Sequence, residues 1–130
     1  MSVETAMRDA LYAELSGDGA LNALINRVHD GPPAKASPPY VMLGEVTGGD
    51  WGTKTADGRE LRVTVTVVDA GETSARVAGI LPLVEAAVRR CVVPAGWQAG
   101  SVVLSRSRLV AARAGEWSAL MEFRLRLLGA

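Results

Sequence analysis

The sequence has little of several residue types on which common functions depend. It contains one cysteine, one histidine, three tryptophans, two tyrosines and one phenylalanine in 130 residues. A single cysteine, Cys91, cannot form an internal disulfide bond, which is compatible with a reducing compartment. His29 has no second histidine at metal-ligand spacing, so a surface or loop-anchoring role is expected for it. The low aromatic content argues against a stacking platform for single-stranded nucleic acid.

Long apolar runs are also missing. The longest are a few residues, whereas a membrane-spanning helix needs roughly 20 apolar residues. The first residues include Glu4, Asp9 and Glu14 and lack the basic and apolar regions of a signal peptide, so secretion is not expected. The composition, 48% hydrophobic and 22% charged, is typical of a globular protein, and the length predicts a single domain at residues 1–130.

The net charge is zero, but the two halves carry opposite charges. Residues 1–60 contain nine acidic and five basic residues, whereas residues 61–130 contain five acidic residues and nine arginines. Opposite charges of this kind can serve self-association, with the acidic side of one subunit against the basic side of the next. They can equally neutralise each other within one fold, and the sequence leaves both interpretations open.

Two periodicities predict the main elements. From Leu61 to Val67 every odd position is apolar and every even position is polar, which is typical of a strand with one buried face. Odd positions from Ala119 to Leu127 are again apolar, with Glu122, Arg124 and Arg126 on the other side. Between them, after a turn in which Thr73 or Ser74 is the expected N-cap, apolar residues spaced three or four apart predict one face of a long helix. These residues are Val77, Ile80, Leu81, Val84, Val88 and Cys91.

The remaining elements complete an α-β-β-α-β-β order. Ser2 is the expected N-cap of a first helix, residues 20–28 predict a second short helical segment, and residues 40–46 and 101–113 predict strands. The inner face of the first helix is expected to contain Met7, Ala10, Leu11 and Leu15. The predicted fold class is α+β, an antiparallel sheet of about four strands packed by helices on one face. Pro82 lies inside the long helix and is expected to kink or split it.

Residues 47–59 predict a long polar, glycine-rich loop with Trp51 in its middle. The length exceeds that of an ordinary hairpin turn, so we expect this loop to be mobile or to form an assembly contact. Its sequence has a superficial likeness to a phosphate-binding loop. That motif requires glycine immediately before the Lys-Ser/Thr pair, whereas Thr53 stands there and no helix pattern follows. We therefore reject phosphate-loop chemistry.

Arginines on the last two predicted strands are the main candidate functional residues. A basic sheet face of this kind would suit phosphate or an acidic protein surface, although a solvated face partly neutralised by Glu116 and Glu122 explains it as well. Phosphate binding alone would not read a DNA sequence. The arginines are Arg106, Arg108, Arg113, Arg124 and Arg126.

Cys91 lies on the apolar helix stripe, where it is expected to act as a small hydrophobic residue rather than a nucleophile.

The order of these segments resembles that of the tail terminator (tail-completion) proteins of long-tailed phages and gene transfer agents. The resemblance covers nearly the whole chain and lies in the succession of segments rather than in one diagnostic motif. The segments are ALYAEL at residues 10–15, ALNALI at 20–25, a proline-rich passage, PYVMLGE at 39–45, RVTV at 62–65, a long helix at 70–88 and MEFRL at 121–125. Pro82 and the connection at residues 94–100 depart from the family pattern.

The resemblance implies a structural role rather than an enzymatic one. Such proteins form a ring, commonly of six subunits, on the head-proximal end of the tail tube. The ring stops tube polymerisation and offers a surface to the head–tail connector (stopper) protein, while DNA passes through its lumen without sequence recognition. The implied partners are therefore further copies of the chain, the tail tube protein, the connector and DNA, with no cofactor, metal or membrane. The implied location is the tail–neck junction of a phage or gene transfer particle, after synthesis in the bacterial cytoplasm.

Within this resemblance, the arginines have two candidate roles. They either meet the acidic half of the next subunit and close the ring by head-to-tail contacts, or they line the lumen and follow the DNA backbone. Asp50, Trp51 and Lys54 are the candidate contacts of the loop with tube or connector. The alternatives are another neck or baseplate adaptor of the same particle and a small α+β ligand-binding domain or enzyme. The apolar strand faces lack the polar residues that such a pocket needs.

Overall fold

The computed structural model describes residues 2–130 as a five-stranded sheet with three helices. The spatial strand order is β1-β2-β3-β5-β4; β1 pairs with β2 in parallel, and the other pairs are antiparallel. No helix in this range has the length and apolar character needed to span a membrane. The elements are α1 (Val3–Gly17), α2 (Gly19–Asn22), β1 (Arg27–Asp30), β2 (Tyr40–Asp50), β3 (Gly58–Ala70), α3 (Ala75–Arg89), β4 (Trp97–Arg113) and β5 (Glu116–Gly129).

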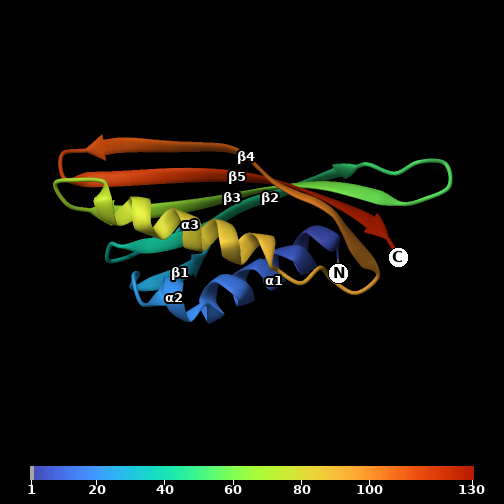
Figure 1. Cartoon of the computed structure of the whole chain (residues 1–130), viewed down its shortest axis with the longest axis horizontal. Helices are drawn as coiled ribbons and strands as arrows, with labels where there is room; N and C mark the ends of the chain where they lie inside the picture. The colour runs from blue at the N-terminus through green and yellow to red at the C-terminus, as the bar shows by residue number, and fades with distance from the viewer. Residues whose placement is uncertain (1) are drawn as a thin grey trace.

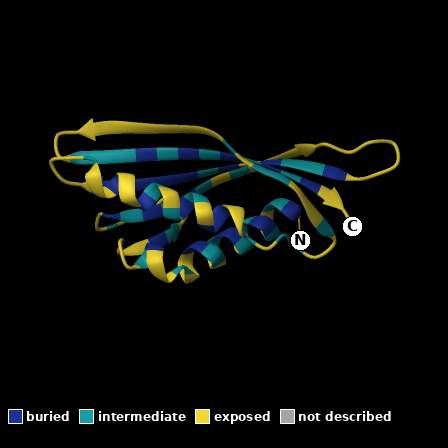
Figure 2. Cartoon of the chain, viewed as in Figure 1, coloured by how far each residue is buried: buried dark blue, intermediate teal, exposed yellow. Residues whose placement is uncertain are grey.

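The helices lie together on one face of the sheet, which confirms the predicted α+β class (Figure 1). The odd positions of β3 and β5 form the buried floor beneath them, as the alternation predicts. Even positions of β5 face the other way and are at least partly exposed (Figure 2). One apolar layer therefore holds the domain together. Its strand residues are Leu61, Val63, Val65, Val67, Ala119, Met121, Phe123, Leu125 and Leu127.

Helix α1 begins where the sequence predicts. The Ser2 side chain accepts a hydrogen bond from the backbone N–H of Thr5 at 3.1 Å, which satisfies one of the free donors of the first turn. Its buried stripe contains the predicted Met7, Leu11 and Leu15 together with Val3, while Ala10 is only partly buried. The side-chain cap explains where this helix begins, and the apolar stripe with a period of 3.6 residues explains which of its faces is buried.

Pro82 was expected to kink or split the long helix, and helix α3 is continuous through it, so the split does not occur. Pro82 is exposed, and it removes only the one hydrogen bond that its own missing N–H would have donated. The buried stripe of Val77, Ile80, Val84 and Val88 continues on the opposite side and holds both halves against the sheet. At the N-terminus, Thr73 Oγ1 accepts from the N–H of Ala75 at 3.4 Å, whereas the Ser74 side chain makes no cap bond.

The sheet has one strand more than the four predicted, because β1 lies where the second helical segment was expected to end. The helix there, α2, stops at Asn22, and β1 pairs with the start of β2 from Arg27↔Tyr40 to Asp30↔Leu43. Two backbone bonds fix its ends: Asn26 N–H donates to Pro39 O at 2.8 Å and Gly31 N–H donates to Leu43 O at 2.9 Å. These partners lie across a proline-rich loop, so local periodicity does not reveal the pairing.

Nearly half of the predicted loop at residues 47–59 is strand. Strand β2 continues to Asp50 and β3 begins at Gly58, with pairs such as Thr47↔Arg62 and Asp50↔Arg59. Only residues 51–57 connect the strands, at the end of a ribbon that extends beyond the helices (Figure 1). Most of this ribbon's β2 residues are exposed, so they lack the apolar alternation by which strands are recognised.

Strand β4 forms one edge of the sheet and is interrupted along its length. Its register with β5 shifts between Ala99 and Ser101, between Leu104 and Arg106, and between Ala111 and Arg113. At the second shift, the Ser105 hydroxyl donates to the carbonyl oxygen of Glu122 at 3.1 Å. Every residue from Ser105 to Arg113 is exposed (Figure 2), whereas Val102 and Leu104, nearer the start of the strand, pack partly against the core.

Asp69 links the end of β3 to the first turn of α3. Its carboxylate is 1% exposed and receives two hydrogen bonds from Arg76, at 2.5 and 3.0 Å, and one from the N–H of Ala70 at 2.8 Å. The hydrogen bonds from Arg76 lower the pKa of Asp69, while burial acts in the opposite direction. This ion pair fixes the direction in which α3 leaves the sheet.

Replacing this carboxylate should destabilise the fold. Asp69→Asn removes the negative charge and one of the two carboxylate oxygens to which Arg76 donates, and we expect the free energy of unfolding at pH 7, measured by urea titration, to fall by about 2 kcal/mol. Because the folded-state pKa of Asp69 lies below its ordinary 3.8, its contribution is complete above that value and is lost as the pH falls through the folded pKa. The variant should therefore lose less stability on acidification. Glu72→Gln, at an exposed acid beside the same turn, is the matched control.

Candidate interaction surface

The sheet face opposite the helices, here called the open face, carries the predicted arginines. Directly paired residues of antiparallel strands point to the same side. Arg124 and Arg126 of β5 therefore share this face with their β3 partners Arg62 and Glu60. In β4, Arg106 is paired with Glu122 and also lies on this face. The predicted basic face exists, but acidic residues are interleaved with it.

Arg126 is bound within the chain. Its Nε lies 2.9 Å from Glu60 Oε2, and its guanidinium carbon lies 5.0 Å from the centre of the Trp51 ring. The hydrogen bond from Arg126 is the main cause that lowers the pKa of Glu60. Arg62 also reaches Glu60, at 3.2 Å. Arg126 thus connects β5 to β3 and to the β2–β3 connection.

The other four arginines differ in their surroundings. Arg113 lies 3.5 Å from Glu116 across the β4–β5 turn. Arg124 has a buried Nε without a hydrogen-bond partner. Arg106 and Arg108 are exposed and form no ion pair within residues 2–130. Among the five, Arg106 and Arg108 are therefore the most available to another molecule.

Trp51 lies close to the arginine face rather than at the tip of its loop. Trp51 is 37% exposed, and its backbone N–H donates to Gly58 O at 3.0 Å. Its ring also approaches Gly100 of β4, because a Cβ added at that glycine would lie 3.6 Å from the ring edge. Asp50 accepts from the N–H of Gly52 at 3.1 Å and so shapes the start of the turn. Lys54 is exposed further along the connection. The structure brings Trp51 and Arg126 together, a proximity that the sequence did not indicate.

The opposite charges of the two halves meet partly within the chain. Arg90, at the end of α3, pairs with Glu14 at 2.6 Å and with Asp18. The pKa of Asp18 is lowered first by the hydrogen bond from the N–H of Leu21 and then by Arg90. Arg126 and Glu60 form a second pair between the halves. For these residues the intramolecular interpretation of the charge asymmetry holds.

His29 and Cys91 show no arrangement for chemistry. His29 packs edge-on against Tyr40, with ring centres 5.4 Å apart, and the described residues contain no group of three or more histidine, cysteine, aspartate or glutamate side chains placed to hold a metal. Cys91 lies just beyond α3 and is partly buried against the core. Burial raises the pKa of its thiol to about 11, so the reactive thiolate is scarce at neutral pH.

A family model described as tail completion protein gp17 matches residues 9–127. The chain belongs to this family. The family predicted from the order of segments is therefore confirmed, and membership in a family of tail proteins argues against the ligand-binding or enzymatic alternative. No curated protein gives a significant match to the chain.

Two solved structures share the fold of this tail completion protein. A chain from the virion of a native gene transfer agent particle superposes with a TM-score of 0.82 at 23% sequence identity, with 98% of each chain covered. The gp17 protein of bacteriophage SPP1 superposes with a TM-score of 0.64 at 19% identity, covering 94% of this chain and 88% of that one. The path of the backbone is conserved over nearly the whole length despite this low identity.

Removing the contact between Arg126 and Trp51 should loosen the β2–β3 connection. In Arg126→Gln the cation above the ring and the pair with Glu60 are lost, and we expect backbone amides of residues 51–57 to exchange about fivefold faster. Hydrogen exchange followed by NMR would report this at the N–H groups of Trp51 and Thr53, which both donate within the connection. Arg108→Gln is the control, and equal exchange in both variants would contradict the contact.

Proposed function

We propose that this tail completion protein acts as a ring on the head-proximal end of a phage-like tail tube. The proposed ring is a hexamer, and light scattering tests this number of subunits. The ring ends tube polymerisation and joins the tail to the head–tail connector, and DNA passes through it. The observation that carries the proposal is the family match over residues 9–127. The fold shared with a chain of a gene transfer agent virion supports a place in such a particle.

The role is structural rather than catalytic. The space between helices and sheet, where a small α+β enzyme would hold a ligand, is filled by packed side chains such as Leu11, Ile80 and Phe123. Arg62, Arg106, Arg124 and Arg126 lie on the open face instead. Such a surface suits reversible contacts between proteins.

Ring closure places Arg106 and Arg108 against the next subunit. Both are exposed on an edge strand, and neither is neutralised within the described residues. A head-to-tail ring needs two different surfaces on each subunit, and an unneutralised basic edge is a suitable candidate for one of them. The connection at residues 51–57, with Asp50, Trp51 and Lys54, lies at the end of a projecting ribbon and is proposed to contact the tube or the connector (Figure 1).

Light scattering over a range of protein and salt concentrations tests the ring. We expect the wild-type protein to reach about six times the monomer mass and to dissociate as salt rises, because charged contacts are screened over about 10 Å at 0.1 M salt. Arg106→Glu/Arg108→Glu should remain monomeric. Lys35→Glu/Lys54→Glu makes the same change in net charge away from β4 and should still assemble.

Three outcomes would contradict this arrangement. Intact rings of the β4 variant together with impaired head–tail joining would assign these arginines to the lumen instead. A wild-type monomer under all conditions, with no binding to the ends of purified tail tubes, would contradict the ring itself. Binding at another position on the particle would indicate a different neck or baseplate adaptor.

A further inference from the structure

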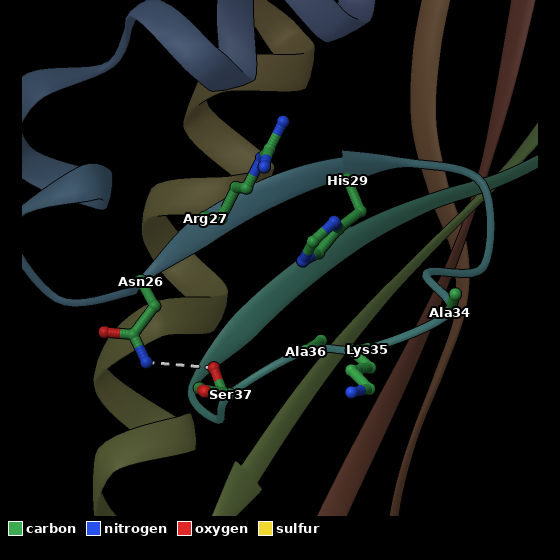
Figure 3. Close-up of a pocket in the computed structure, with 7 residues that line it drawn as sticks. All are labelled: Asn26, Arg27, His29, Ala34, Lys35, Ala36 and Ser37. Carbon is green, nitrogen blue, oxygen red and sulfur yellow. Dashed lines mark hydrogen bonds between the residues drawn. The ribbon is translucent and has the colours of Figure 1, made fainter.

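A cleft lies at the opposite edge of the sheet from β4. This cleft of about 740 Å³ opens between β1 and the segment that leads from it to β2, and none of the functions above uses it. Figure 3 shows His29 pointing from β1 toward the space beside residues 34–37, which form the other wall, while the charged ends of Arg27 and Lys35 point outward on the two sides. Its lining residues are Asn26, Arg27, His29, Ala34, Lys35, Ala36 and Ser37.

The charge of this cleft is of one sign. Arg27 on one wall and Lys35 on the other are exposed, and neither forms an ion pair within residues 2–130. No acidic residue lines the cleft. The nearby Asp30 is bound elsewhere, since its carboxylate accepts from Arg8 of α1 at 2.7 Å. The cleft thus presents two permanent cations with no counter-charge of its own.

Hydrogen bonds hold the walls in place before any ligand binds. The Asn26 side-chain amide donates to Ser37 O at 2.9 Å and to Pro38 O at 3.1 Å, and the backbone bond from Asn26 to Pro39 fixes the same end. At the other end Gly31 N–H donates to Leu43 O. Because both ends of the segment are fixed, little ordering is needed on binding, which favours affinity.

We propose that this cleft binds an acidic peptide segment of a partner protein, with carboxylates placed against Arg27 and Lys35. An extended segment that crosses the open cleft would meet Arg27 at the outer side of one wall and Lys35 at the outer side of the other. Duplex DNA is the less suitable occupant, since its binding depends on many phosphate contacts along the helix. The neighbouring part of the open face continues from the cleft with Tyr40 and Met42 rather than with further cations. The site does not depend on ring formation.

A fluorescein-labelled peptide of six glutamates is the probe. We expect it to bind the full chain at low salt and to shift the NMR signals of residues 26–37 selectively. Arg27→Gln/Lys35→Gln should weaken binding about tenfold, since each exposed ion pair accounts for roughly a three- to fivefold change. Arg62→Gln/Arg89→Gln removes the same charge from two exposed positions outside the cleft and should bind as the wild type does.

Several outcomes would overturn the proposal. These are no binding of the peptide, signal shifts spread over other surfaces, or equal affinity of the Arg27→Gln/Lys35→Gln variant and the wild type. A short DNA duplex that shifts the same residues more strongly at equal charge concentration would make the cleft a nucleic-acid contact. Light scattering of the same variants distinguishes these results from a failure of ring assembly, because only assembly changes the mass of the protein.

Discussion

The burial of one sheet face under α1 and α3 is the constraint on which the rest of the structure depends. Valines and leucines at the odd positions of β3 and β5 pack against the stripes of both helices. Since neighbouring side chains of a strand point to opposite faces, this packing also decides which residues face solvent. Glu60, Arg124 and Arg126 lie together on the open face because Leu61, Phe123 and Leu125 are buried.

Much of the fold could be predicted because its central elements are amphipathic. Periods of 2 and of three or four residues reveal β3, β5, α1 and α3, which together supply most of the core. Strand β1 was not predicted, because a four-residue strand with one buried side chain, Val28, is too short to show a period in its sequence. The end of β2 was not predicted for a related reason. Its residues are exposed, so their sequence lacks the apolar alternation that would indicate pairing with β3.

The candidate surface could be predicted only in outline. Alternation places Arg124 and Arg126 on one face of β5, as the structure shows. Their partners depend on the register between strands far apart in sequence, and no local signal sets Glu60 opposite Arg126 or brings Trp51 to its guanidinium. Only the structure therefore distinguishes Arg106 and Arg108 from the arginines that form ion pairs within the chain. The family could be predicted because the order of elements is itself readable from sequence.

The three register shifts in β4 have a consequence for the free subunit. A long, regular edge strand is a template on which other chains add by backbone hydrogen bonding, and this leads to aggregates without a defined end. The shifts at Gly100, Ser105 and Ala112 break that template into short pieces, and the arginines between them repel a second copy of the same edge. Contacts at this edge are thus left to side chains, which meet only a matching surface. This edge is thereby protected from the open-ended addition of further strands.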